Sequence, residues 1–287
     1  METANEKFRV ALLSVCAAVG LVVFKGVVGF ATGSLGILSE ALHSALDLVA
    51  AAITCFAVKF SDRPADKEHN FGHGKMENLS ALIEAVLLLI TCAWIIFEAV
   101  SRLLSGRTHI SIGFWSFAVV IVSIIVDMTR SRSLMKVAKK HKSQALEADA
   151  LHFSTDILSS CVVLVGLIFA YFGNYWADSV AALGVAVIVI WVSARLSIRA
   201  VNQLLDRAPD GLRERIAHIV RGVEGVERWH DLRVRSSGAD YEIDVNIHVN
   251  SSLSIVQAHE IAEQVEHSIR VQLGGSALVN VHTEPDK

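Results

Sequence analysis

Long apolar runs separated by short polar loops dominate the first two thirds of the chain. A membrane-spanning helix needs about 20 mainly apolar residues. Six segments have that length and character: residues 10–31, 37–60, 79–103, 111–129, 146–172 and 176–198. Beyond residue 205 these runs stop, and apolar and polar residues alternate over short distances. The pattern predicts a polytopic α-helical membrane domain of six transmembrane helices at residues 1–205, followed by a soluble domain at residues 206–287.

The soluble tail has the pattern of a small α+β domain. Its elements are predicted in the order helix 210–222, strand 229–236, strand 240–249, helix 254–272 and strand 277–283. Within the second strand, apolar residues alternate strictly with polar ones, which is typical of a half-buried strand. Ser254 is expected to cap the second helix, and the first two strands meet at the turn Ser237-Gly238. An α-β-β-α-β order favours helices on one face of a sheet.

Composition and charge agree with a membrane protein. Hydrophobic residues make up 53% of the chain and charged residues 19%, whereas soluble domains carry about 25% charged residues. A net charge of −3 gives no indication of a nucleic-acid partner. Lys and Arg gather near the N-terminus and in the loops after the second and fourth spans, as in residues 130–142. By the positive-inside rule both termini are cytoplasmic, and we expect a multi-pass protein of the cell inner (plasma) membrane.

Two of the spans carry a near-repeat of ionisable residues. Residues 40–47 read Glu-Ala-Leu-His-Ser-Ala-Leu-Asp, and residues 149–156 read Asp-Ala-Leu-His-Phe-Ser-Thr-Asp. Positions four apart share one helix face, so each helix presents an imidazole beside a carboxylate. If the two helices face each other, they form a cage of four ligands: His43, Asp47, His152 and Asp156.

A divalent cation is the partner that such a cage needs. A charged side chain at the centre of a membrane helix costs roughly 2.5–3.5 kcal/mol, and a cation would neutralise both carboxylates while satisfying both imidazoles. Mixed nitrogen and oxygen coordination suits Zn²⁺. The outer acids Glu40 and Asp149 are open to several roles, including outer-shell partner, proton carrier and charge at the mouth. Three other acids inside the spans favour interhelical or interfacial contacts over metal binding: Glu84, Glu98 and Asp127.

Histidines also cluster outside the spans. The loop after the second span holds Asp66, His69 and His73, and the strand ends and second helix of the tail hold His230, His248, His259, His282 and Glu284. Spacing alone leaves two interpretations open for each set, a metal site or a solvated surface.

The two His-x-x-x-Asp pairs resemble the transport site of the cation diffusion facilitators, which are membrane transporters that export zinc and related divalent ions in exchange for protons. The resemblance covers nearly the whole chain: six spans, the segment 71–75 (Phe-Gly-His-Gly-Lys) that opens the third span, and a histidine-bearing tail.

The resemblance implies further assignments. Asp66, His69 and His73 match a second metal site in the loop. His230, His248, His259, His282 and Glu284 match the ligands of a binuclear zinc site in the cytoplasmic domain, and Lys75 with Asp206 matches a charge pair that links the two domains. The family also implies a homodimer with a metallochaperone-like cytoplasmic domain. Some bacterial members carry Asp at the position of His43, so the cage of two imidazoles and two carboxylates is expected to favour Zn²⁺ over harder ions.

These observations predict a Zn²⁺/proton antiporter that works by alternating access, with Zn²⁺ as the transported substrate and as a structural or regulatory ion of the tail. The alternatives are a membrane-anchored zinc sensor or storage protein without transport, and a metal channel. An intramembrane hydrolase is disfavoured because HExxH is absent and four protein ligands leave no position for a reactive water. We therefore expect no enzymatic activity.

Overall fold

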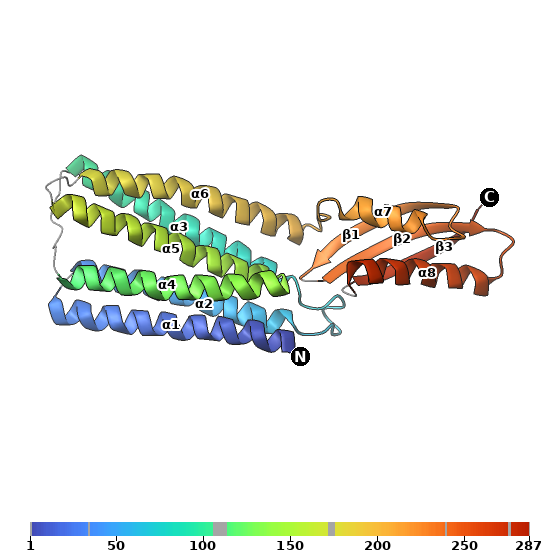
Figure 1. The fold of residues 1–287 in the computed structure, drawn as a ribbon, viewed down its shortest axis with the longest axis horizontal. Coiled ribbons are helices and arrows are strands. Elements are labelled where there is room, and N and C mark those ends of the chain that lie inside the picture. Colours follow the sequence, from blue (N-terminus) through green and yellow to red (C-terminus); the bar gives the residue numbers. More distant parts are fainter. Residues whose placement is uncertain are drawn as a thin grey trace. The chain divides into compact units, whose positions relative to one another are not determined.

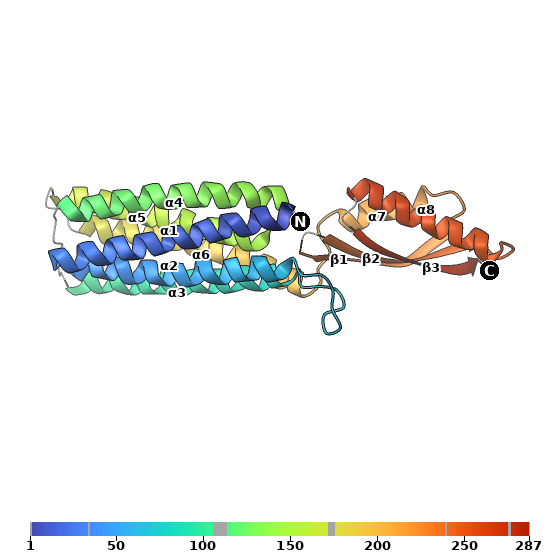
Figure 2. The same cartoon turned by 90° about the horizontal axis from the view of Figure 1, so that it is seen from below.

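Six long helices form the first part of the molecule. The computed structural model describes residues 2–33, 35–105, 114–171, 176–238, 240–274 and 277–286. Its long helices run side by side (Figures 1 and 2) and are α1 (Glu2–Thr32), α2 (Leu35–Ser61), α3 (Met76–Ser105), α4 (Phe114–His141), α5 (Gln144–Tyr171) and α6 (Trp176–Leu204). Each predicted span falls on one of these helices, except that residues 111–113 and 172 lie outside the described part.

Four of the described helices are long and apolar enough to cross a membrane by length and composition: α1, α2, α3 and α6. The other two, α4 and α5, contain more charge. In α4 the charge lies mostly in its second half, where Arg130 begins a run of basic residues that ends at His141. The helix therefore continues well beyond the apolar segment that the sequence marks as a span.

Small side chains line the contacts between these helices. Ala51 on α2, Ala150 on α5 and Ala11 on α1 are each 1% exposed or less, and they pack with Leu134 of α4 and Phe153 of α5. In a membrane, small residues let helix backbones approach closely, and dispersion contacts replace the hydrophobic effect as the source of packing energy. Large apolar side chains cover the outer faces of the bundle, as expected for surfaces in contact with lipid: Leu13, Phe30, Trp94, Phe97 and Trp191.

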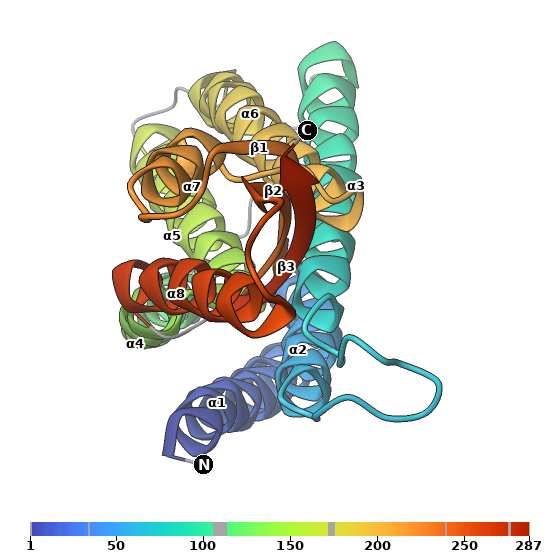
Figure 3. The same cartoon turned by 90° about the vertical axis from the view of Figure 1, so that its right-hand side faces the viewer.

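The tail confirms the predicted α-β-β-α-β order. Its elements are α7 (Leu212–Arg221), β1 (Arg228–Ser237), β2 (Asp240–Asn250), α8 (Ile255–Leu273) and β3 (Ala277–Asp286). The strands form one sheet in the order β1-β2-β3, with β1 antiparallel and β3 parallel to β2. Both helices cover the same face of this sheet (Figure 3). Ser254 caps α8 and forms a capping box with Gln257.

The sheet has one buried and one open face. Ile243, Val245 and Ile247 of β2 point toward the helices and are at most 1% exposed, where they pack with Ile216 of α7 and Val265 of α8. The alternate residues of β2 line the open face. Parallel pairing of β2 with β3 needs a crossover connection, and α8 supplies it.

The chain folds as two compact units. The first, the helical unit, comprises residues 1–63 and 76–200, and the second, the tail unit, comprises residues 64–75 and 201–287. The loop that joins α2 to α3 thus packs with the tail. The contact is close, because a Cβ added to Gly74 would lie 2.9 Å from the carbonyl carbon and oxygen of Ser237. The last turn of α6 also belongs to the tail unit.

Candidate metal centres

Side chains of α2 and α5 converge inside the helical unit. Nε2 of His152 lies 3.3 Å from Oδ1 of Asp47 and 3.5 Å from Oδ2 of Asp156. One ligand atom from each of these three residues lies within 4.8 Å of the others. Asp47 is 8% exposed and His152 is 2% exposed. The arrangement follows from the spacing of four on α5, which stacks His152 over Asp156 one helical turn apart.

His43 lies at the edge of this group. Its Nε2 is 3.9 Å from Oδ1 of Asp47 and 4.0 Å from Oδ1 of Asp156, and 37% of its side chain is exposed. A cavity of about 250 Å³ is lined by His43, Asp47 and Asp156, and also by Lys25 and Asp127. The structure thus groups three residues of the predicted cage, and places His43 next to them at the cavity wall. Two imidazoles and two carboxylates in this arrangement are able to hold a divalent cation.

The outer acids of the near-repeat have other partners. Nζ of Lys25 donates a hydrogen bond to Oε2 of Glu40 at 3.2 Å and another to the hydroxyl of Ser44 at 2.9 Å. Asp149 is fully buried and accepts a hydrogen bond from the Ser14 hydroxyl at 3.4 Å. Neither acid belongs to a metal-binding group among the described residues.

Two other acids in the spans contact basic or polar side chains, one within its own helix and one on neighbouring helices. Asp127 pairs with Arg130 of the same helix at 3.2 Å. Glu84 of α3 accepts a hydrogen bond from Thr54 of α2 and lies close to His152 of α5. This last contact has no signal in the sequence, because spacing along α3 does not show which helix Glu84 faces.

The loop residues Asp66, His69 and His73 lie together in the tail unit. Nδ1 of His69 is 3.4 Å from Oδ1 of Asp66, and Nε2 of His73 is 3.6 Å from Oδ2 of the same carboxylate. The backbone amides of His69 and Glu68 donate hydrogen bonds to Oδ1 of Asp66. These bonds, led by that of His69, lower the pKa of Asp66 below its ordinary value. The loop therefore offers an ionised, solvent-accessible carboxylate beside two imidazoles at neutral pH.

A third group occupies the open face of the sheet. Oε2 of Glu284 on β3 lies 3.5 Å from Nε2 of His230 and 3.7 Å from Nε2 of His248. A bulge after His230, with Asp231 at φ 51°, lets His230 pair with Asn246 and so share the open face. Without the extra residue, strand alternation would turn His230 toward the helices.

Of the five predicted tail ligands, the structure groups only these three among the described residues. His282 is an exposed neighbour, with its Nε2 3.8 Å from Oε1 of Glu284. His259 lies on α8, where it pairs with Glu263 at 3.4 Å. One residue that the sequence interpretation omitted is close by, because Oδ1 of Asp286 lies 4.0 Å from Nδ1 of His248. The predicted last strand ends at residue 283, three residues short of it.

Lys75 and Asp206 form an ion pair within the tail unit. Nζ of Lys75 lies 2.7 Å from Oδ1 of Asp206, and Arg235 approaches the other carboxylate oxygen at 3.2 Å. Partial burial by itself raises the pKa of Asp206, but the hydrogen bond and charge of Lys75, followed by those of Arg235, outweigh it and hold the pKa below its ordinary value. The pair joins the end of the loop to the segment that follows α6.

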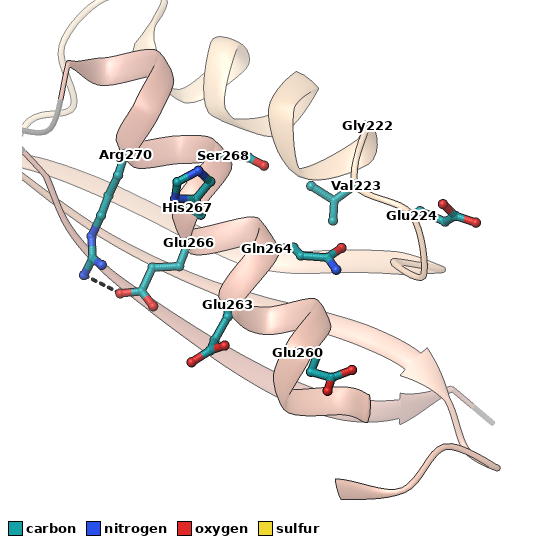
Figure 4. Close-up of a pocket in the computed structure, with 10 residues that line it drawn as sticks. All are labelled: Gly222, Val223, Glu224, Glu260, Glu263, Gln264, Glu266, His267, Ser268 and Arg270. Carbon is teal, nitrogen blue, oxygen red and sulfur yellow. Dashed lines mark ion pairs between the residues drawn. The ribbon is translucent and has the colours of Figure 1, made fainter. Parts of the chain in front are cut away.

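Another cavity of the tail, of about 770 Å³, lies along α8 and is open to solvent. Figure 4 shows three of its acidic side chains, Glu260, Glu263 and Glu266, spread along α8, with Glu266 paired to Arg270. These residues do not converge on one point, so the cavity has the character of a solvated helix face.

Two family models of known proteins match almost the whole chain. Residues 11–205 match the family model of the cation efflux transmembrane domain, and residues 208–286 match that of the cation efflux protein cytoplasmic domain. The chain belongs to the cation efflux family. This confirms the resemblance to the cation diffusion facilitators and supports divalent metal export across a membrane as the activity of the protein.

Curated relatives include the cation-efflux pump FieF of Salmonella arizonae, 33% identical over 282 residues, which span 96% of this chain and 92% of that one. The FieF pump of Cronobacter sakazakii is 34% identical over 280 residues with the same coverage. Among solved structures, a nickel form of the MamM C-terminal domain matches with 26% identity and a TM-score of 0.26, over 28% of this chain and all of that one.

Proposed function

We propose that this protein exports Zn²⁺ from the cytoplasm in exchange for protons, by alternating access of the cage formed by His43, Asp47, His152 and Asp156. The convergence of Asp47, His152 and Asp156 within 4.8 Å is the observation that carries the proposal. Two carboxylates balance the charge of a divalent ion, and the mixture of nitrogen and oxygen donors favours Zn²⁺ over harder cations.

Protons and metal compete for the same atoms. A metal-binding imidazole must be neutral and a metal-binding carboxylate ionised, so metal binding releases protons and protonation weakens metal binding. Histidine is suited to this exchange because its unperturbed pKa is about 6.5. Zn²⁺ enters while the cage is open to the cytoplasm and is released when protons reach His43 or His152 from the other side. Inward proton flow then drives metal outward.

In this proposal each part of the chain has its own role. Residues 1–205 cross the inner membrane six times with both ends in the cytoplasm, and residues 206–287 form a cytoplasmic domain that dimerises. The loop group of Asp66, His69 and His73 and the group on the open sheet face bind cytoplasmic zinc. The ion pair of Lys75 with Asp206 couples their occupancy to the membrane domain.

Uptake of radiolabelled Zn²⁺ into proteoliposomes with an imposed pH gradient tests the transport proposal. We expect gradient-dependent uptake by the native chain and its loss in Asp47→Ala and in Asp156→Ala. Asp210→Ala is the matched control, because the Asp210 side chain is 94% exposed and lies in the tail unit. Uptake retained in both cage variants would show that the near-repeat is structural.

The same assay separates the alternatives. Uptake that continues after an ionophore has collapsed the gradient would refute antiport, and a rate that fails to saturate with Zn²⁺ would indicate a channel. No uptake by a folded native chain, together with zinc binding to the tail, would favour the sensor. Competition by Mn²⁺ as strong as that by Zn²⁺ would refute the preference for the softer ion.

A further inference from the structure

A buried carboxylate stands directly behind one histidine of the cage. Glu84 of α3 is fully buried, and its two oxygens have different environments. Oε1 accepts a hydrogen bond from the Thr54 hydroxyl at 2.8 Å. Oε2 lies 3.4 Å from Nδ1 of His152, and both atoms are buried without a hydrogen-bond partner among the described residues.

The His152 ring therefore bridges Glu84 and the cage. Its Nε2 faces Asp47 and Asp156, at 3.3 and 3.5 Å, while its Nδ1 faces Glu84. A neutral imidazole carries its proton on one nitrogen and a lone pair on the other. A ring that binds metal through Nε2 must hold the proton on Nδ1. In an environment where His152 is 2% exposed, that N–H needs an acceptor within the protein.

We propose that Glu84 is a positioning residue for the transport site: its Oε2 accepts the Nδ1–H of His152, which selects the tautomer whose Nε2 lone pair points at the metal and fixes the orientation of the ring. This inference rests on the proposed function of the cage. Glu84 is not itself a ligand, because the imidazole ring lies between its carboxylate and the other two acids. Metal-binding histidines commonly donate their second N–H to a carboxylate in this way.

The support for Glu84 extends one step further, to the interface of α2 and α3. The Thr54 hydroxyl, which is fully buried, contacts the Ser80 hydroxyl at 3.3 Å as well as Glu84. Thr54 thus fixes one oxygen of the carboxylate and leaves the other directed at His152. These contacts connect α3 and α2 to His152, the cage residue on α5. The packing of the three helices therefore sets the direction of the Nε2 lone pair of His152.

The test compares Zn²⁺ uptake by the full-length native chain with that of Glu84→Leu and Glu84→Gln in proteoliposomes. Loss of a carboxylate that supports a metal-binding histidine typically weakens metal binding about 10–100-fold. We expect Glu84→Leu to raise KM for Zn²⁺ by about this factor, with a much smaller change in the maximal rate. Glu84→Gln keeps an acceptor oxygen of similar size and should fall between Leu and the native chain.

Glu147→Leu is the matched control, since Glu147 is a carboxylate of α5 that pairs with Arg199 at 2.9 Å and not with a cage residue. Its KM should stay near the native value. If Glu84→Leu does not fold, Thr54→Val is measured in its place. This substitution removes the hydroxyl that donates to Oε1 of Glu84, so KM should rise, but by less than in Glu84→Gln.

The possible results distinguish a failure of the positioning role from a failure of the proposed function. Native uptake with an unchanged KM in Glu84→Leu would overturn the positioning role while leaving the proposed function intact. A fall in the maximal rate with an unchanged KM would also overturn it, because Glu84 would then act in a step after metal binding. Absence of native uptake would refute the proposed function itself.

Discussion

The two histidines of the cage are held unequally, and this predicts unequal costs for their removal. His152 is buried, and its Nε2 is 3.3 and 3.5 Å from the two carboxylates. His43 is 3.9 and 4.0 Å from the same residues, with 37% of its side chain exposed to the cavity. Loss of His152 removes a central ligand that water does not reach, whereas loss of His43 opens a position that water fills.

The magnitudes follow from zinc sites in general. Four-ligand structural sites bind Zn²⁺ with about 10–16 kcal/mol, or about 3 kcal/mol per ligand, which is roughly 100-fold in affinity. We expect His152→Ala to weaken binding by at least about this factor. Three protein ligands and a water make a stable zinc site, so His43→Ala should cost about tenfold, or about 1.4 kcal/mol.

The assay is KM for Zn²⁺ in proteoliposomes under one fixed pH gradient, with His218→Ala as control because His218 is exposed on α7. Equal increases in KM for His43→Ala and His152→Ala would refute the reasoning, as would a larger increase for His43→Ala.

Three further predictions concern stability of the tail unit, measured as the thermal unfolding midpoint of the full chain in detergent. Asp206→Asn should lower the midpoint by a few degrees at pH 7 in low salt, since half-exposed ion pairs such as that with Lys75 contribute about 0.2–1 kcal/mol. Because the pKa of Asp206 is lowered in the folded state, the ion pair contributes stability above about pH 4 and loses this contribution as the pH falls further. The unfolding midpoints of the native chain and of Asp206→Asn should therefore converge in acid. A difference between them that does not change with pH would contradict the ion-pair origin. Gly74→Ala should lower the free energy of unfolding by about 1–3 kcal/mol, because the added Cβ would lie 2.9 Å from the backbone of Ser237. An unchanged midpoint would show that the loop shifts to make room for the methyl group. Ser254→Ala should cost about 1 kcal/mol by removing the cap of α8, and an unchanged midpoint would mean that water replaces it.

The tail could be predicted well from the sequence, and the long helices less completely. Strict alternation in residues 240–249 fixes both the strand and its buried face, and the observed β2 differs from it by one residue. The span predicted at residues 111–129 ends where the apolar run ends, yet α4 continues to His141. Hydropathy marks the expected edge of the membrane, whereas the helix continues because Lys, Arg, Met and Ala are good helix formers in water as well.

The cage could be predicted because its ligands repeat at a helical spacing on two spans. What spacing cannot show is which helix a lone polar residue faces. Glu84 interrupts an apolar stretch of α3, which indicates an intramembrane contact, but its position behind His152 depends on how α3 packs against α5. Asp286 escaped prediction for a different reason, because the alternation of β3 is interrupted near its end by Pro285.

The tail ligands show how one backbone irregularity decides which side chains meet. Simple alternation along β1 would place His230 on the helix-covered face with Leu232, and the bulge at Asp231 moves it to the open face beside His248 and Glu284. His259 lies on the other side of the sheet, in the helix layer, because α8 turns Ala262 and Val265 inward and leaves His259 in solvent. Within one tail unit the sheet therefore separates His259 from the three grouped ligands. One copy of the tail unit therefore does not bring all five predicted residues together among the residues that the structure describes.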